Sequence, residues 1–168
     1  MHPVVEISKM AVEAYVRDRV VLKPPPDPPA ELRDQAGVFV SLKKWGVLRG
    51  CIGTIEPCCP SLAEEAIYNA ISSATHDPRF LPVEEDELED LAYSVDVLCP
   101  PEPITGLHEL DPTCYGVVVE RGHQRGLLLP DLEGVDTPEQ QVDIARRKAG
   151  IGPDDPVQLY RFLVQRFR

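Results

Sequence analysis

Proline constrains how this chain can fold more than any other residue type. The 168 residues include 18 prolines, and two clusters of them lie at residues 23–29 and 99–103. Because proline lacks a backbone N–H and has a fixed φ, neither cluster can form a helix or a central β-strand. We therefore predict stiff connectors at both places. A polyproline ligand for a partner domain is the alternative for the first cluster.

The length and charge favour one acidic domain. A chain of 168 residues with 43% hydrophobic residues is long enough to bury a core. The net charge of −11 opposes binding to nucleic acid and to anionic membranes. The start of the chain lacks the basic segment and apolar run of a signal peptide, and no stretch is apolar enough to span a bilayer. We expect a single cytoplasmic domain over residues 1–168.

The five cysteines form neither a disulfide framework nor a zinc ribbon, because their number is odd and no CxxC spacing occurs. Reduced thiols are the simplest interpretation. A metal site built from Cys51, Cys58, Cys59 and His76 lacks any recognised ligand spacing. We therefore predict no metal.

Hydrophobic periodicity predicts an amphipathic helix near residues 4–20, ended by the first proline cluster. A second helix begins at Ser61, whose side chain can accept from the Glu64 N–H while the Glu64 side chain reaches back. This helix runs to about Thr75.

The order hairpin, helix, strand occurs twice, over residues 37–99 and 113–168. Its elements are hairpins near 38–54 and 115–129, helices from Ser61 and from Thr137 to Gly150, and strands at 92–98 and 157–167. This recurrence indicates an internal duplication. We predict an α+β fold in which both hairpins belong to one strongly curved, mainly antiparallel sheet.

The sharpest chemical candidate is Cys51, which lies between Gly50 and Gly53 in the segment LRGCIGT. On a regular strand Arg49 projects to the same face, where a cation favours the thiolate or binds an anion. The alternative is a small, buried Cys51 with glycines that allow close packing of backbones.

Further candidates come from the second helix and the segment after it. Asn69 lies on the polar flank of the helix, and Asp77 and Arg79 follow its end. Asp77 and Arg79 can form a structural ion pair or contribute charge to a cleft, and His76 can act as a base toward Cys51. We expect Arg49, Cys51, Asn69, Asp77 and Arg79 to converge on one concave region.

The chain resembles the AMMECR domain family, also called AmmeMemoRadiSam system protein A, from about Gly37 to Phe162. The resemblance rests on residues 48–54, Asn69, residues 77–80 and residues 159–162. It implies a barrel-like sheet built from two repeats with helices packed outside. It also implies association with Memo-like and radical S-adenosylmethionine proteins. His76 occupies a position that varies in the family.

Two functions remain open. The first is an enzyme or enzyme component that acts on a small anionic or carbonyl-containing substrate, with Cys51 and Arg49 as catalytic residues. Substrate binding then falls to Gly50, Gly53, Thr54, Asn69, Asp77 and Arg79. No residue set in this chain can hold an iron–sulfur cluster, so we expect no cofactor of its own. The second function is a non-catalytic adaptor that binds a protein or small ligand, with the LRGCIG segment shaping a groove.

Overall fold

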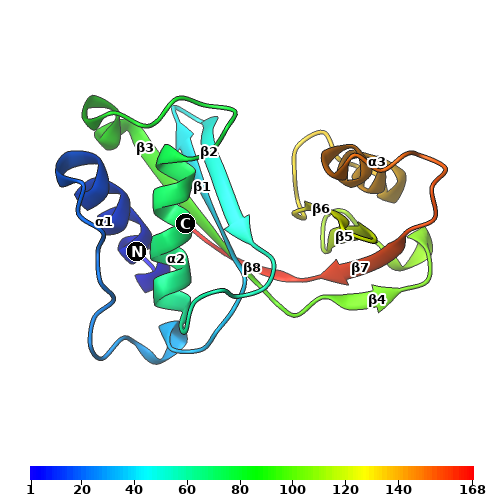
Figure 1. Ribbon diagram of the computed structural model, residues 1–168, viewed down its shortest axis with the longest axis horizontal. Helices are drawn as coiled ribbons and strands as arrows, with labels where there is room; N and C mark the ends of the chain where they lie inside the picture. Colours follow the sequence, from blue (N-terminus) through cyan, green and yellow to red (C-terminus); the bar gives the residue numbers. More distant parts are fainter. The chain divides into compact units, whose positions relative to one another are not determined.

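The chain forms two four-stranded antiparallel sheets with helices packed against them (Figure 1). The computed structural model describes residues 1–168. Unit 1 comprises Met1–Leu98 and Gln165–Arg168, and unit 2 comprises Cys99–Val164. The α+β class is confirmed, but the prediction of one continuous barrel-like sheet was wrong, because each hairpin lies in a sheet of its own.

Unit 1 has the strand order β2-β1-β3-β8. Its elements are α1 (Pro3–Asp18), β1 (Val38–Lys44), β2 (Val47–Thr54), α2 (Leu62–Thr75), β3 (Leu91–Leu98) and β8 (Val164–Phe167), with short 3₁₀ helices at Ala30–Leu32 and Glu85–Asp90. Helix α1 packs on α2, and both helices contact the sheet. The first proline cluster is neither helix nor strand, which confirms that part of the prediction.

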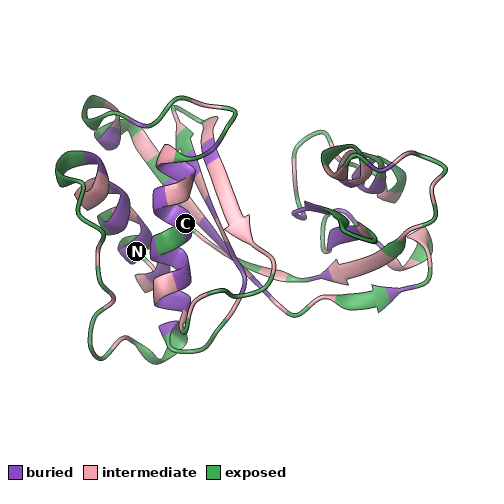
Figure 2. Cartoon of the chain, viewed as in Figure 1, coloured by how far each residue is buried: buried purple, intermediate pink, exposed green.

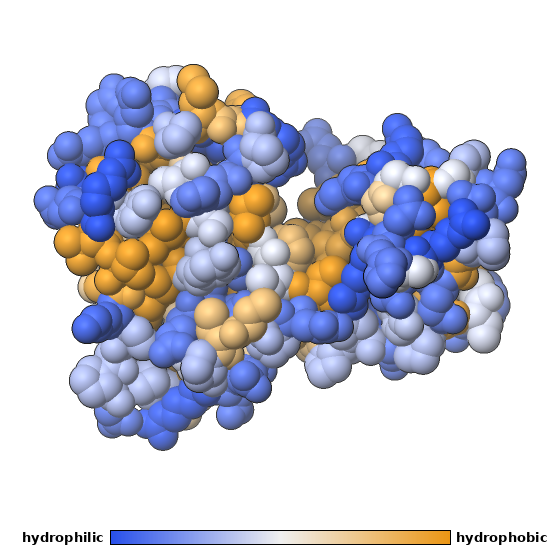
Figure 3. All heavy atoms as spheres, in the orientation of Figure 1, coloured by the Kyte–Doolittle hydropathy of each residue, from blue (hydrophilic) through white to orange (hydrophobic).

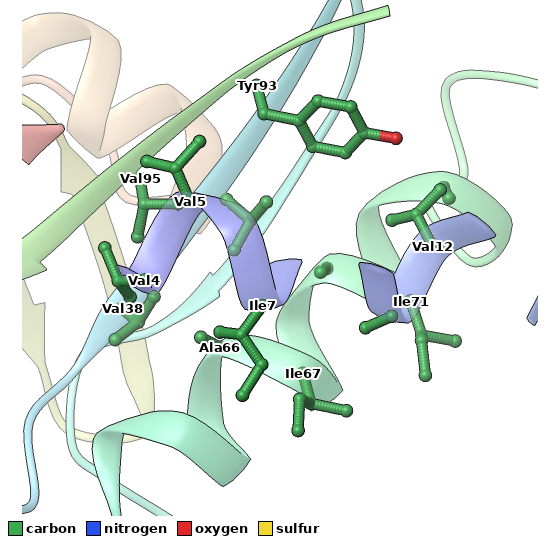
Figure 4. Packing of buried hydrophobic residues seen from close by; sticks show 14 of the residues in the cluster. Val4, Val5, Ile7, Val12, Val38, Ala66, Ile67, Ile71, Tyr93 and Val95 are labelled. Atoms are coloured by element: carbon green, nitrogen blue, oxygen red, sulfur yellow. The ribbon is translucent and has the colours of Figure 1, made fainter. Parts of the chain in front are cut away.

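The core of unit 1 lies between its helices and one face of its sheet (Figure 4). Val38, Val40 and Leu42 of β1 are fully buried and alternate with the more exposed Phe39 and Ser41. In Figure 2 the purple of buried residues runs along α1 and α2, whereas β2 is drawn mostly in the pink of intermediate exposure. The period of two in the sequence therefore determined which side of β1 faces the helices.

Local signals locate the helix ends. Ser61 caps α2 by accepting from the Glu64 N–H at 3.3 Å, as predicted. Helix α1 ends at Asp18, earlier than predicted, because Arg19 adopts a left-handed conformation and its N–H bonds back to Ala14 and Tyr15. The proline cluster therefore follows the helix without ending it.

Unit 2 has the strand order β4-β7-β5-β6. Its elements are β4 (Glu102–Ile104), β5 (Gly116–Arg121), β6 (Gln124–Leu128), α3 (Pro138–Ala149) and β7 (Gln158–Phe162), with a 3₁₀ turn at Leu107–Glu109. The predicted capping box of Thr137 and Gln140 and the left-handed Gly150 cap are both present on α3. Pro103 lies in an edge strand, where a missing N–H is tolerated, so the second proline cluster is a connector only in part.

The two units repeat one topology. In each sheet a hairpin is followed by a helix and by a strand that pairs with the first hairpin strand. A side chain at Gly50 would collide with the Ser73 carbonyl of α2, and one at Gly126 would collide with the Ala145 carbonyl of α3. Glycine therefore allows the closest helix approach at matching places in both repeats.

The fourth strand of each sheet is exchanged between the repeats. Strand β3 of the first sheet continues into β4 of the second, and β7 of the second continues into β8 of the first. The single strand predicted at 157–167 is thus two strands, interrupted at Leu163, because they pair in different sheets.

Candidate functional site

The segment around Cys51 contains a β-bulge. Leu42 pairs with Gly50, but the next residue of β1, Lys43, pairs with Leu48. Arg49 is therefore the extra residue of the bulge. Because a bulge breaks the regular alternation of side chains, the argument that Arg49 and Cys51 share a face does not hold here.

The Arg49 guanidinium binds Glu87 instead of approaching the thiol. Its Nε and Nη2 atoms donate to the two carboxylate oxygens of Glu87, each at 3.0 Å. Nη1 donates to the Leu81 carbonyl at 2.8 Å and Nη2 to the Pro82 carbonyl at 3.3 Å. Hydrogen bonds from Arg49 are the main reason that the pKa of Glu87 falls to about 2. The structure thus gives Arg49 a role in fixing the segment between α2 and β3.

Cys51 is half-buried, and its sulfur has a hydroxyl donor. Ser41, its partner across the β1–β2 ladder, donates from Oγ to Cys51 Sγ at 3.2 Å. The Cys51 N–H donates to Asp77 Oδ2 at 3.0 Å, and Arg79 Nη2 donates to the Cys51 carbonyl at 3.4 Å. Cys51, Asp77 and Arg79 therefore meet, as we expected.

Asp77 holds Arg79 in place. Arg79 Nε and Nη2 donate to the two Asp77 oxygens at 3.0 and 2.8 Å, and the Arg79 N–H donates to Oδ1 at 3.1 Å. These bonds lower the pKa of Asp77 to about 2, chiefly through the Arg79 side chain. The same pairing raises the pKa of Arg79, and the charge of Cys51 adds to that effect. Arg79 is therefore the cation that interacts with Cys51, and its side chain remains 56% exposed.

Asn69 lies outside this cluster. It is fully buried, and its amide donates to the Val38 carbonyl at 3.0 Å and to Thr54 Oγ1 at 3.1 Å. Thr54 in turn donates to Glu65 Oε1 at 2.6 Å, while Glu65 Oε2 accepts from the N–H groups of residues 58 and 59. The expected exposure of Asn69 to a concave region was wrong, because the amide ties α2 to the sheet.

Sequence reasoning missed Glu65. Its carboxylate is fully buried and accepts three hydrogen bonds. The available signal was its position one helical turn before Asn69, on the same side of α2 as the buried Leu62 and Ala66. An acidic residue at such a position indicates a buried hydrogen-bond acceptor.

Two predicted binding glycines have packing roles. Gly50 allows α2 to approach β2, and a side chain at Gly53 would collide with the ring of Phe39. Glycine is needed at both positions because neighbouring groups pack too closely there for a side chain.

His76 and the other cysteines have surroundings of their own. His76 Nδ1 contacts Thr75 Oγ1 at 2.7 Å at the end of α2. Burial, followed by the charge of Glu65, raises the pKa of Cys59 to about 11, whereas Cys58 and Cys114 are exposed. No group of three His, Cys, Asp or Glu side chains is placed to bind a metal ion.

The pocket with the largest cavity volume among those described lies on the helical side of unit 1. It has a volume of about 560 Å³ and is lined by residues of α1, of α2 and of the segment after α1. Hydrophobic atoms gather over this part of unit 1 in Figure 3. Its lining includes His76 but none of the eight predicted site residues.

No helix combines the length and apolarity needed to cross a bilayer.

Comparison with known proteins tests the family resemblance. A model of the AMMECR1 family matches residues 5–167. The chain belongs to the AMMECR1 family. A relative from Thermotoga maritima is 53% identical over 170 residues, which cover 99% of this chain and 98% of that protein. The crystal structure of protein PH0010 from Pyrococcus horikoshii has a TM-score of 0.89 at 37% identity, covering 97% of this chain and 88% of that chain.

One AMMECR1-family relative is much longer than its matching region. Protein CA_C1420 from Clostridium acetobutylicum is 47% identical over 168 residues, which cover 99% of this chain but only 36% of that protein. The family fold is therefore joined there to a larger additional polypeptide.

Proposed function

We propose that this AMMECR1-family protein is an enzyme or enzyme component in which Cys51 is a reactive thiol. The observation that supports this most directly is the Ser41 hydroxyl donating to Cys51 Sγ beside a guanidinium that Asp77 holds. Hydrogen-bond donors and nearby cations favour a thiolate over a thiol, and the thiolate is the nucleophile.

The substrate class follows from the exposed cation. Arg79 remains 56% exposed while it is bound to Asp77, so its guanidinium is accessible to a small carboxylate or carbonyl compound. In the proposed step the Cys51 sulfur bonds to the carbonyl carbon, and the carbonyl electron pair moves to the oxygen. Arg79 stabilises that negative charge, and Asp77 is its positioning residue. Arg79 thus takes the role that the sequence suggested for Arg49.

Only the first repeat carries these groups. The residue after the helix-contacting glycine is Cys51 in β2 but Leu127 in β6, and β6 has no bulge opposite β5. A purely structural requirement of the repeat would be met by leucine at both places. The difference supports a chemical role for Cys51.

Alkylation rates test this proposal. In the folded protein at pH 7, iodoacetamide should modify Cys51 faster than the other four cysteines, measured by mass spectrometry of peptides. Arg79→Ala should slow Cys51 modification about tenfold, because removing an adjacent cation raises a thiol pKa by about one unit. Ser41→Ala should slow it as well, whereas Arg49→Ala should leave the rate unchanged at temperatures where the variant is folded.

Slow labelling of Cys51 together with a lower melting temperature of Cys51→Ser would contradict the enzyme proposal. That result is expected of a buried structural thiol, because the serine hydroxyl would then enter an apolar site.

The second candidate function is an adaptor that binds partner proteins. The observation that favours it is the additional polypeptide joined to the family fold in the C. acetobutylicum relative. The partners that we propose on family resemblance are Memo-like and radical S-adenosylmethionine proteins, the latter supplying any radical cofactor. A cytoplasmic location suits both candidates, since none of the five cysteines forms a disulfide and cytosolic thiols stay reduced.

A further inference from the structure

The tip of the β1–β2 hairpin presents the single tryptophan of the chain to solvent. Trp45 is 77% exposed, and it has a φ of 50° next to Gly46 with a φ of 81°. Asparagine and glycine are the usual residues in such a turn, and a bulky residue with positive φ is a genuine outlier. An unfavourable conformation that exposes a large aromatic ring points to a role outside folding.

Exposed apolar side chains occur at two more positions: Val47 directly follows the turn, and Leu81 belongs to the segment whose carbonyl accepts from Arg49 of the same hairpin. Val47 is 70% exposed and Leu81 is 83% exposed. Figure 1 shows the β1–β2 turn and the segment between α2 and β3 at the same end of unit 1. We refer to Trp45, Val47 and Leu81 as the Trp45 tip.

A rigid ionic framework supports the Trp45 tip. Glu87 accepts from Lys44 Nζ at 3.1 Å and from Arg49 at two positions, and Arg49 also donates to the Leu81 carbonyl. Lys44 Nζ lies 4.8 Å from the centre of the Trp45 ring. The apolar groups are therefore presented on a preorganised base, which lowers the entropic cost of binding.

The charge around the tip favours a protein as its occupant. Lys44 and Arg49 offset the charge of Glu87, but the same 3₁₀ segment, Glu85–Asp90, carries four further carboxylates that are exposed. This negative charge repels an anionic lipid surface. A net charge of −11 on each copy also opposes self-association. Tryptophan surrounded by smaller apolar groups is typical of the anchor residues of protein interfaces.

We propose that the Trp45 tip inserts into an apolar pocket of a partner protein of the type that the C. acetobutylicum relative carries in its own chain. In that relative only 36% of the protein matches this chain. Joining two domains raises their effective concentration for each other, which suits a domain that docks on its neighbour. This docking is independent of any chemistry at Cys51.

Photo-crosslinking in the source cells identifies the occupant. The full chain carries p-benzoylphenylalanine at position 47, which leaves Trp45 in place, or at position 10 as a control, since Met10 is 50% exposed on α1. We expect position 47 to yield an adduct with a protein whose sequence matches the additional part of the C. acetobutylicum relative, and position 10 to yield none. Trp45→Asn in the same chain should abolish the adduct.

The proposal would be overturned if position 47 crosslinked to a second copy of this chain or to lipid. It would also be overturned if positions 10 and 47 gave the same adduct in equal yield.

Affinity measurements with the captured full-length partner separate docking from folding. Trp45→Asn creates an Asn-Gly turn, so its melting temperature should not fall, whereas its affinity should fall at least about 30-fold, as for a truncated anchor residue. Met10→Gln should bind like the unmodified protein. A double variant Val47→Thr, Leu81→Ser provides a second test with Trp45 intact and should also weaken binding. Unchanged affinity in both tip variants would sink the proposal.

Discussion

At the scale of single residues, two carboxylates of the segment between α2 and β3 bind the β1–β2 hairpin. Asp77 binds Arg79 and the Cys51 N–H, and Glu87 binds Arg49 and Lys44. Both have pKa values near 2 in the folded protein, below the ordinary values of 3.8 for aspartate and 4.5 for glutamate. Both therefore stabilise the folded state only while they are ionised.

This pairing predicts acid sensitivity. A carboxyl group whose pKa is lowered by folding contributes its stability above the unfolded pKa and loses it as pH falls toward the folded pKa. The contribution of Glu87 should therefore disappear between about pH 4.5 and 2, an effect of about 3 kcal/mol by proton linkage. Urea unfolding across this range should show a shallower loss for Glu87→Gln than for the unmodified protein. Equal slopes would contradict the prediction.

Tyr93 offers the opposite case of a buried group without a partner. Its hydroxyl is buried with no hydrogen-bond partner, at the edge of the core in Figure 4, and burial raises its pKa. Tyr93→Phe should therefore stabilise the protein by about 1 kcal/mol, because it removes an unsatisfied polar atom. Thermal unfolding measures this, with the exposed Tyr68→Phe as the control. A lower melting temperature for Tyr93→Phe would show that the hydroxyl has a partner in solution.

At the scale of elements, each repeat depends on one glycine where its helix crosses its hairpin. Gly50 faces the Ser73 carbonyl and Gly126 faces the Ala145 carbonyl. Neither backbone carbonyl can rotate away as a side chain can. The helix–sheet distance is thus set by the absence of a Cβ atom in both repeats.

Alanine at either glycine should separate helix from sheet. We expect Gly50→Ala and Gly126→Ala each to destabilise the protein by about 2–3 kcal/mol, the usual cost of overpacking. Gly106→Ala is the matched control, since its Cβ would meet only the His108 side chain. Chemical denaturation would contradict this account if all three variants had equal stability.

At the scale of the whole molecule, strand exchange links the two repeats through the chain. Strand β8 completes the sheet of unit 1, and its Arg166 donates to both oxygens of the buried Asp96 at 2.7 and 2.8 Å. Strand β4 likewise completes the sheet of unit 2 by pairing with β7. Neither sheet is complete without a strand that continues from the other repeat.

This exchange predicts a single cooperative unfolding transition. Because Trp45, the single tryptophan, is already 77% exposed in the folded protein, its fluorescence is a poor probe of unfolding. Hydrogen exchange read by mass spectrometry at each denaturant concentration instead gives one unfolding curve from peptides of unit 1 and a second from peptides of unit 2. The two curves should coincide. Arg166→Ala should lower the free energy of unfolding obtained from either curve by about 3 kcal/mol, because it leaves Asp96 buried without this partner. Separate transitions would show two independent domains.

The sequence alone determined the local elements of this protein. The period of the hydrophobic residues located both hairpins. The same period located α2 and α3, together with their N-caps at Ser61 and Thr137 and the C-cap at Gly150. These signals act between residues that are close in the chain. Family membership and the meeting of Cys51 with Asp77 and Arg79 followed from its motifs.

Only the tertiary structure decided how distant segments pair. Contacts between residues far apart in sequence determine the strand exchange and the bulge that turns Arg49 toward Glu87. They also determine the burial of Glu65 and Asn69. Periodicity indicates which face of a strand is apolar, but it does not specify which strand lies beside it. For this reason the two repeats were predicted correctly from the sequence, whereas the prediction that both hairpins belong to one continuous sheet was wrong.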